Sequence, residues 1–201
     1  PIHVGLDFGL TPAAAIGQRL NNGRWVILHE IVTEDMGLER FGNQLLAELN
    51  AKYPKAQVLI WGDPAGMQRD AIYEVTAFDY LRTLGLRAQP TASNNFKVRR
   101  EGAAAPMQRL INGKPGLIVD KSCKMIRKSL AGGYHFKRIA VGAGHERFKD
   151  SPNKNEHSHI GDAFGYLMLG GGEHKRMTKN SLAANTMIVQ TVATAEFDVF
   201  K

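Results

Sequence analysis

The sequence has little of three features that often reveal the class of a protein. It contains a single cysteine, Cys123, so an internal disulfide is impossible and a cysteine-based zinc site is not expected. It has no apolar run long enough to cross a bilayer, and we expect no signal peptide. The phosphate-binding pattern Gly-x-x-x-x-Gly-Lys-[Ser/Thr] is also absent. These absences exclude a disulfide scaffold and a P-loop nucleotide site, and they favour a reducing compartment with no membrane partner.

What the sequence does have is the composition of a globular, basic protein. Its 201 residues are 43% hydrophobic and 22% charged, which is enough for one domain with a core of its own. The net charge of +7 favours a polyanionic partner such as nucleic acid, although basic proteins without such a partner are common. The chain enters a strand pattern at Ile2 with no preceding methionine, so we expect a domain of a longer polypeptide.

The first quarter of the chain predicts an antiparallel meander followed by a helix. Apolar and β-branched runs predict strands at 2–8, 13–20 and 25–32, and the Asn-Asn-Gly sequence at 21–23 is typical of a hairpin turn. Leucine and phenylalanine then recur at helical spacing over 38–52, which predicts a helix there.

The remaining chain alternates strands and helices before a tail. Further strands are expected at 57–61, 86–90 and 117–119, and a hairpin at 134–141 and 145–149 around the glycines of 142–144. Helices are expected at 74–84, ended by Gly85, at 94–112, kinked or interrupted by Pro106, and at 122–130 and 158–169. We expect residues 1–172 to form one α/β domain, with a mixed sheet of antiparallel meander and parallel strands flanked by helices. Residues 173–201 are expected to be a flexible or partner-binding tail.

Three aspartates stand where a carboxylate is costly to bury. Asp7 lies in the first predicted strand, Asp63 at the carboxyl end of the strand at 57–61, and Asp162 near the start of the last helix. A right-handed crossover can place the two strands side by side, and the last helix can then bring Asp162 over them. Converging carboxylates suit hard divalent cations held beside a phosphate. Each aspartate alone could also have a role that needs no metal. Asp7 could pair with a buried lysine, Asp63 could form a turn before Pro64, and Asp162 could be a solvent-exposed helix residue.

The strings around these aspartates resemble the three nuclease motifs of phage terminase large subunits. They read Gly-Leu-Asp-Phe-Gly at 5–9, Trp-Gly-Asp-Pro-Ala-Gly at 61–66 and His-Ser-His-Ile-Gly-Asp-Ala at 157–163, in the family's order and on the same kinds of element. The resemblance spans residues 2–169 and implies the fold of ribonuclease H (RNase H) and RuvC-type resolvases. It also implies a metal-dependent endonuclease that cuts concatemeric double-stranded viral DNA during genome packaging, in the cytoplasm of the host cell of a bacteriophage or prophage.

Cofactors, partners and residue roles follow from this resemblance. Two divalent cations, Mg²⁺ or Mn²⁺, would be held by Asp7 as the bridging ligand, with Asp63 on one ion and Asp162 on the other. The implied partners are double-stranded DNA, an N-terminal packaging ATPase of the same polypeptide, the small terminase subunit and the portal protein. The missing P-loop pattern agrees with a nuclease domain separated from its ATPase.

Lys154 and His159 are further catalytic candidates. Lys154 lies in the loop before the last helix and could stabilise a phosphate or position a water, while His159 lies on the same helix face as Asp162. Each could equally be an ordinary solvated residue. Phosphate contacts that are sensitive to salt and weakly specific for sequence are expected from a basic DNA-binding set. This set is Lys97, Arg99, Arg100, Lys137, Arg138, Arg147 and Lys149.

Two other enzyme classes stay open at this point. A RuvC-like resolvase or a transposase-type nuclease core fits the aspartates equally well. The string Asp-Phe-Gly-Leu-Thr at 7–11 also resembles the first phosphate loop of the actin, Hsp70 and sugar-kinase superfamily, which would predict nucleotide binding. That superfamily needs a duplicated domain and a second phosphate loop, for which 201 residues are too few. A nucleic-acid-binding module without catalysis is disfavoured, because it has no use for three buried carboxylates.

Overall fold

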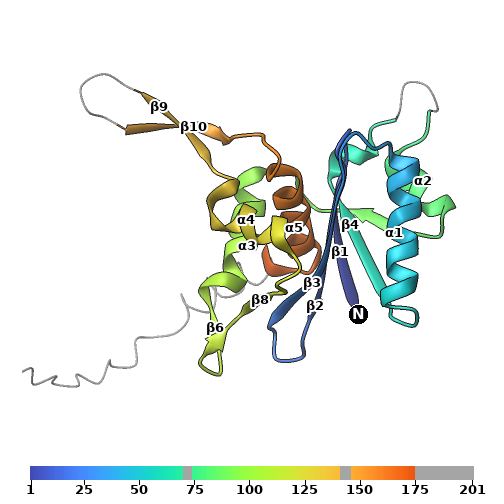
Figure 1. The fold of residues 1–201 in the computed structure, drawn as a ribbon, viewed down its shortest axis with the longest axis horizontal. Helices are drawn as coiled ribbons and strands as arrows, with labels where there is room; N and C mark the ends of the chain where they lie inside the picture. Colours follow the sequence, from blue (N-terminus) through green and yellow to red (C-terminus); the bar gives the residue numbers. More distant parts are fainter. Residues whose placement is uncertain (70–73, 141–145, 175–201) are drawn as a thin grey trace, which may run out of the picture.

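The computed structural model describes residues 1–69, 74–140 and 146–174, and a six-stranded mixed sheet forms its centre (Figure 1). The strands of this sheet are β1 (Ile2–Asp7), β2 (Ala13–Arg19), β3 (Trp25–Val32), β4 (Val58–Gly62), β5 (Ala88–Pro90) and β8 (Leu117–Val119). Their order in space is β5-β4-β1-β2-β3-β8. The glycines at 142–144 and the predicted tail from residue 175 onward lie outside the described residues.

The predicted combination of an antiparallel meander and parallel strands is confirmed. β1 pairs antiparallel with β2, and β2 pairs antiparallel with β3. On its other side β1 runs parallel to β4, as expected for a crossover connection, and β5 and β8 add parallel strands at the two edges. The parallel pairing of β1 and β4 matters most for the site, because it brings their carboxyl ends to one edge of the sheet.

Helices cover both faces of this sheet (Figure 1). They are α1 (Leu38–Lys52), α2 (Ala77–Thr83), α3 (Phe96–Gln108), α4 (Lys124–Lys128) and α5 (Ser158–Gly170), with a 3-10 turn at Pro64–Met67 and a π-helical turn at Ser129–Gly133. The core on one face includes residues of α1 and α2, whereas α5 packs on the other face against β1 and β2 and is flanked by α3 and α4. Within the described part of the chain, none of the helices has the length and apolarity that a membrane crossing requires.

The alternation of side chains along β1 determines the face of the sheet on which Asp7 lies. Val4 and Leu6 are buried in the core that includes α1 and α2. Gly5 faces α5 so closely that a Cβ atom there would lie 2.1 Å from the carbonyl oxygen of Ala163. Since residues two apart in a strand share a face, Asp7 points to the same side as Gly5, toward α5.

Two hairpins lie outside the central sheet. The shorter one joins β6 (Leu110–Ile111) to β7 (Lys114–Pro115), and the longer one joins β9 (Phe136–Ala140) to β10 (Glu146–Pro152). The longer hairpin matches the predicted one, although β10 extends further than expected. It projects away from the body beside α3 and α5 (Figure 1).

Three predicted helices have different bounds in the structure. α2 begins later than residue 74 because the Thr76 hydroxyl caps it, accepting a hydrogen bond from the Asp79 amide at 3.0 Å. The helix expected at 94–112 continues through Pro106 and ends at Gln108, so the proline does not interrupt it. The helix expected at 122–130 is shorter, because the chain passes into a π-helical turn in which Gly132 adopts a φ of 111°.

Glu173, the first residue of the predicted tail, packs into the body. Its side chain is completely buried. One carboxylate oxygen accepts a hydrogen bond from the Trp25 indole at 2.8 Å, and Arg109 donates to both oxygens at 2.7 and 3.0 Å. The folded body therefore includes Glu173.

Candidate active site

The candidate site begins where β1 and β4 end. Leu6 of β1 is in register with Gly62 of β4, and the amide of Asp63 donates to the Leu6 carbonyl at 3.1 Å. Asp7, the last residue of β1, and Asp63, the first residue after β4, therefore stand on adjacent strands at one edge. The carboxyl ends of neighbouring parallel strands are where open α/β sheets bind ligands.

Asp7 is a buried carboxylate with one close polar partner. It is 6% exposed, and its Oδ2 lies 2.9 Å from Nδ1 of His159, the second residue of α5. Burial raises the pKa of Asp7 from 3.8 to about 6, the hydrogen bond from His159 opposes this, and the charge of Asp162 adds to the rise. An additional positive charge at this edge would stabilise the carboxylate.

Asp162 projects from α5 into a group of donors. Its Oδ2 lies 2.5 Å from Nζ of Lys154, and its Oδ1 accepts a hydrogen bond from the Tyr134 hydroxyl at 2.9 Å. Nη1 of Arg99 lies 2.6 Å from the same Oδ1. The Asp162 side chain is 3% exposed whereas that of Lys154 is 63% exposed, so Lys154 approaches a buried carboxylate from solvent.

Asp63 is fixed by its own backbone and by α5. Its Oδ1 accepts a hydrogen bond from the Ala65 amide at 2.9 Å, which caps the 3-10 turn after β4. Its carboxylate also interacts with the hydroxyl of Tyr166, a buried side chain of α5. Burial raises the pKa of Tyr166 above its usual range, with the Arg99 charge opposing the rise and the Asp63 charge adding to it. The neutral hydroxyl of Tyr166 thus links Asp63 to the helix that carries Asp162.

The three aspartates share an edge without forming a compact ligand cluster. Across residues 1–69, 74–140 and 146–174, no group of three or more His, Cys, Asp or Glu side chains is arranged to hold a metal ion. The physical reason lies in their present partners, since Asp162 faces Arg99, Lys154 and a tyrosine hydroxyl, and Asp63 faces a backbone amide. The carboxylates are nevertheless the oxygen donors that hard divalent cations prefer.

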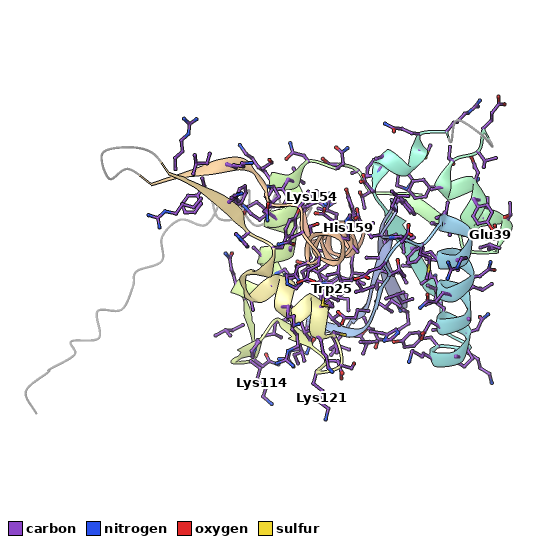
Figure 2. All side chains as sticks on the ribbon, turned by 45° about the horizontal axis from the view of Figure 1, so that its top comes forward. Trp25, Glu39, Lys114, Lys121, Lys154 and His159 are labelled. Atoms are coloured by element: carbon purple, nitrogen blue, oxygen red, sulfur yellow. The ribbon has the colours of Figure 1, made fainter. Side chains whose placement is uncertain are left out.

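Lys154 and His159, the two further catalytic candidates, both contact aspartates at this edge. Figure 2 shows them near each other at the amino-terminal end of α5, while Glu39 of α1 lies on the far side of the molecule. Each contacts one of the predicted aspartates, Lys154 contacting Asp162 and His159 contacting Asp7. The two residues are therefore parts of the site and not isolated surface residues.

The predicted DNA-binding set is divided by the structure. Six of its members are exposed, on α3 and on the projecting hairpin: Lys97, Arg100, Lys137, Arg138, Arg147 and Lys149. Arg99 is the exception and corrects the prediction, because it is only 8% exposed and its charge faces Asp162. Its guanidinium also lies 4.6 Å from the centre of the Tyr166 ring, within cation–π range. Burial thus places Arg99 inside the site and not on a phosphate-binding surface.

Two residues of the site were not predicted from the sequence. Tyr166 follows Asp162 by four residues, so helical spacing could have placed both on one face of α5. Tyr134 carried no such signal, because it lies far from Asp162 in the chain and reaches it only through the turn after α4. The signal for Arg99 was ambiguous, since a buried arginine and a surface arginine look alike in a basic helix.

Several solved structures are similar to this one at low sequence identity. The large terminase nuclease domain of bacteriophage SPP1, solved with bound Mn, matches with a TM-score of 0.53 and 18% identity, over 83% of this chain and 84% of that one. The large terminase nuclease domain of Thermus phage P74-26 matches with a TM-score of 0.51 and 16% identity, over 83% and 77%. RuvC of Thermus thermophilus, in complex with a Holliday junction substrate, gives a TM-score of 0.44 and 14% identity, over 88% and 96%.

No protein-family model matches the chain, and no curated protein matches it in sequence. The two terminase nuclease domains with the higher TM-scores show that the fold is RNase H-like. The fold class expected from the sequence is therefore confirmed, and so is the resemblance to terminase nuclease domains at the level of the fold.

Proposed function

We propose that this chain is the nuclease domain of a phage terminase large subunit, a metal-dependent endonuclease that cleaves concatemeric double-stranded viral DNA during packaging. The observation that carries the proposal is the parallel pairing of β1 with β4. Because of this pairing, Asp7 and Asp63 lie at the same edge of the sheet, beside the helix α5 that carries Asp162. The shared fold with two terminase nuclease domains supports it.

The oxygen-donor chemistry of the three carboxylates suits hard divalent cations, although their present partners keep them apart from one another. Burial disfavours the charged form of Asp7, and a bound cation would favour it, which makes this edge suitable for a positive ligand. We assign Asp7, Asp63 and Asp162 as the ligands of two ions, Mg²⁺ or Mn²⁺, with Asp7 shared between them. When bound, such ions supply an activated water and stabilise the leaving oxygen of the phosphodiester. The bound Mn of the SPP1 domain supports the choice of cation.

The other residues of the site orient these carboxylates or can change partner when a substrate binds. His159 orients Asp7 through its Nδ1 contact, and the Tyr166 hydroxyl orients Asp63. Lys154 has a mostly exposed side chain, and Asp162 has Arg99 and the Tyr134 hydroxyl as further partners, so Lys154 can move from Asp162 to a phosphate oxygen. Lys154 can thereby stabilise charge on the substrate in the role predicted for it.

The wider assignment follows the same proposal. Exposed basic residues of α3 and of the β9–β10 hairpin contact DNA phosphates, which makes binding sensitive to salt. The packaging ATPase of the same polypeptide, the small terminase subunit and the portal protein are the protein partners. The site of action is the cytoplasm of the bacterial host.

A plasmid-nicking assay tests the proposal directly. Supercoiled plasmid is incubated with the wild type, with Asp63→Ala and with Glu39→Ala, each in Mn²⁺, in Mg²⁺ and in EDTA. Glu39 is a matched control because it is an exposed carboxylate on the opposite side of the sheet (Figure 2). Nicking that requires a divalent cation, disappears in Asp63→Ala and persists in Glu39→Ala supports the nuclease. A folded wild type that binds plasmid but never nicks it under any condition contradicts the proposal.

A further inference from the structure

The projecting hairpin exposes two large apolar side chains on opposite faces. Phe148 is 50% exposed and Ile139 is 38% exposed. In the antiparallel register Phe148 stands opposite Arg138, and Ile139 stands opposite Arg147. Directly opposed residues share a face and successive residues alternate, so Phe148 and Ile139 lie on different faces of the hairpin.

The face that carries Phe148 continues into an aromatic cluster at the base of the hairpin. Phe136 lies two residues before Arg138 and so shares the face of Phe148. Its ring meets Phe96 of α3 edge to face, with centroids 5.4 Å apart and planes at 81°. Phe96 in turn meets Tyr134 edge to face at 5.8 Å and 79°. Phe96, Tyr134 and Phe136 thus form a cluster through ring contacts, and Phe148 lies further along the same face of the hairpin. We name these four residues the aromatic strip (Phe96, Tyr134, Phe136 and Phe148).

The inner end of the aromatic strip borders a cavity beside the candidate site. The cavity has a volume of about 210 Å³ and is lined by Phe96, Tyr134 and Phe136 together with Arg99 and Asp162. This is smaller than the roughly 300–1,000 Å³ of drug-sized ligand sites, which favours a single flat group. The strip therefore leads from the tip side of the hairpin to the carboxylate that we assign to the cutting site.

We propose that the aromatic strip stacks unpaired bases of a single-stranded stretch of DNA next to the cut. This inference rests on the proposed nuclease function and names a substrate feature that the function does not require. The faces of bases in an intact duplex are covered by their neighbours, so only unpaired bases can stack on protein rings, whatever their sequence. Fraying or a bubble at the cut site would thus be recognised by ring stacking.

The charges around the strip decide between DNA and a protein partner. Arg138 shares the face of Phe148, and exposed Lys149 adjoins Phe148 in the chain. Exposed Lys137 and Arg147 lie on the other face of the same hairpin, with Ile139. Alternating cationic and aromatic side chains match a polyanionic backbone that carries flat apolar bases. An apolar protein partner would offer no negative charge to the exposed Lys137, Arg147 and Lys149.

Equilibrium binding to three fluorescent DNA probes tests the inference. The full chain is titrated in EDTA, which prevents metal-dependent cleavage, against a fully paired duplex, the same duplex with a central unpaired bubble, and one single strand. We expect the wild type to bind the bubble and the single strand more tightly than the duplex. Phe148→Ala should weaken bubble and single-strand binding at least about fivefold, the loss expected for one stacked base, and should change duplex binding less than about twofold.

Three further variants make the test specific for stacking. Phe148→Tyr keeps a ring and should retain the bubble preference, whereas Phe148→Leu keeps only apolar area and should lose it. Ile139→Ala is the matched control, because it removes an exposed apolar side chain from the other face of the same hairpin. It should leave the preference unchanged.

The outcomes separate this inference from the proposed function. A wild type that binds duplex as tightly as bubbled DNA, or a Phe148→Ala variant that keeps the bubble preference, overturns the aromatic strip and leaves the nuclease assignment intact. Equal losses on all three probes overturn it as well, because they indicate a general hairpin contact. No binding to any DNA overturns both proposals.

Discussion

Two buried carboxylates of this molecule are each paired with an arginine, and their surroundings differ. Glu173 is completely buried near the end of the described chain, and Asp162 is 3% exposed on α5. Arg109 meets Glu173 through both oxygens, whereas Arg99 meets Asp162 through one. Both pairs would look similar in a list of buried ion pairs.

The difference lies in the remaining partners. The Trp25 indole, itself fully buried, donates to Glu173, and no second carboxylate is among the partners found for it in the described residues. Asp162 instead has the solvent-exposed Lys154 as a partner and borders a cavity. The charge of Asp162 also acts on Asp7, whose pKa is raised.

This comparison gives a way to distinguish structural from functional buried acids. A structural acid has a fixed partner for each oxygen and nothing to gain from a further ligand. A functional acid keeps a partner that can leave and stands near another carboxylate, so that a cationic ligand can take the place of that partner. The following predictions test whether Glu173 and Asp162 differ in this way.

The largest expected effect is on cleavage by Asp162→Asn. If Asp162 holds a cation, this variant should lose roughly a hundred- to a thousandfold in nicking rate, the loss seen when one stabiliser of transition-state charge is removed. Its free energy of unfolding should fall by roughly 1 to 3 kcal/mol, because the buried Arg99 loses its counter-charge and this loss is partly offset by relief of repulsion with Asp7. Glu173→Gln should give the reverse pattern, and equal activity losses in the two variants would remove the distinction.

The next effect is on stability at Glu173. Glu173→Ala leaves Arg109 and the Trp25 indole without their acceptor, and we expect a loss of roughly 3 to 4 kcal/mol in urea unfolding. Truncation after Gly172 should cause a similar loss, and truncation after His174 provides the matched control. A chain ending at Gly172 that is as stable as one ending at His174 would show that Glu173 does not support the body.

The pH dependence of stability should reveal Asp7. Its carboxyl loses a proton near pH 4 when unfolded and near pH 6 when folded, so the folded state binds more protons between these values. The contribution of Asp7 to stability is thus fully present below about pH 4 and is lost as pH rises through about 6. Asp7→Asn should remove this decline and be roughly 2 to 3 kcal/mol more stable than the wild type at pH 7 without metal.

Urea unfolding between about pH 2 and pH 8 in EDTA measures this effect. Asp79→Asn is a useful contrast, because its hydrogen bond with Thr76 lowers the pKa of Asp79. The stability that Asp79 contributes is lost as pH falls, which is the opposite slope. An Asp7→Asn variant with the same pH profile of stability as the wild type would contradict a raised pKa for Asp7 in the folded state.

The smallest expected effect separates the neighbours Arg99 and Arg100. Arg100 is exposed and pairs with Glu101, so Arg100→Ala should change the unfolding free energy by less than about 0.5 kcal/mol. It should instead reduce the salt slope of DNA binding by about one. Arg99→Ala should destabilise the fold more and leave that slope unchanged, because its guanidinium faces Asp162. If both variants lower the salt slope of DNA binding equally, Arg99 contacts DNA phosphates as it was first predicted to do.

Much of the fold could be predicted because its signals are local. The meander follows from three apolar runs and an Asn-Asn-Gly turn, and the last helix follows from a continuous apolar pattern. Bounds were missed where a side chain outside the apolar pattern sets the end, as the Thr76 cap does for α2. Pro106 was expected to kink or interrupt α3, and the helix continues past it to Gln108 without interruption.

The candidate site could be predicted only in part. Asp7, Asp63 and Asp162 stand in recognisable strings, and their approach to one edge followed from the crossover rule. The orientation of each carboxylate did not follow, because it depends on Arg99, Lys154 and other partners brought in from α3 and from loops. The assignment of the three aspartates to metal ions therefore remains a prediction.

The sequence by itself determined the class of the fold, the basic character of the chain and the three acids that stand at strand and helix ends. These properties depend on composition and on residues close together in the chain, which periodicity and turn chemistry report directly. Only the tertiary structure decided that Arg99 is buried, that Glu173 packs beneath Trp25, and that four aromatic residues form a strip. Such outcomes arise from contacts between distant segments, and the free energy of burial that decides them has no signature in any single stretch of sequence.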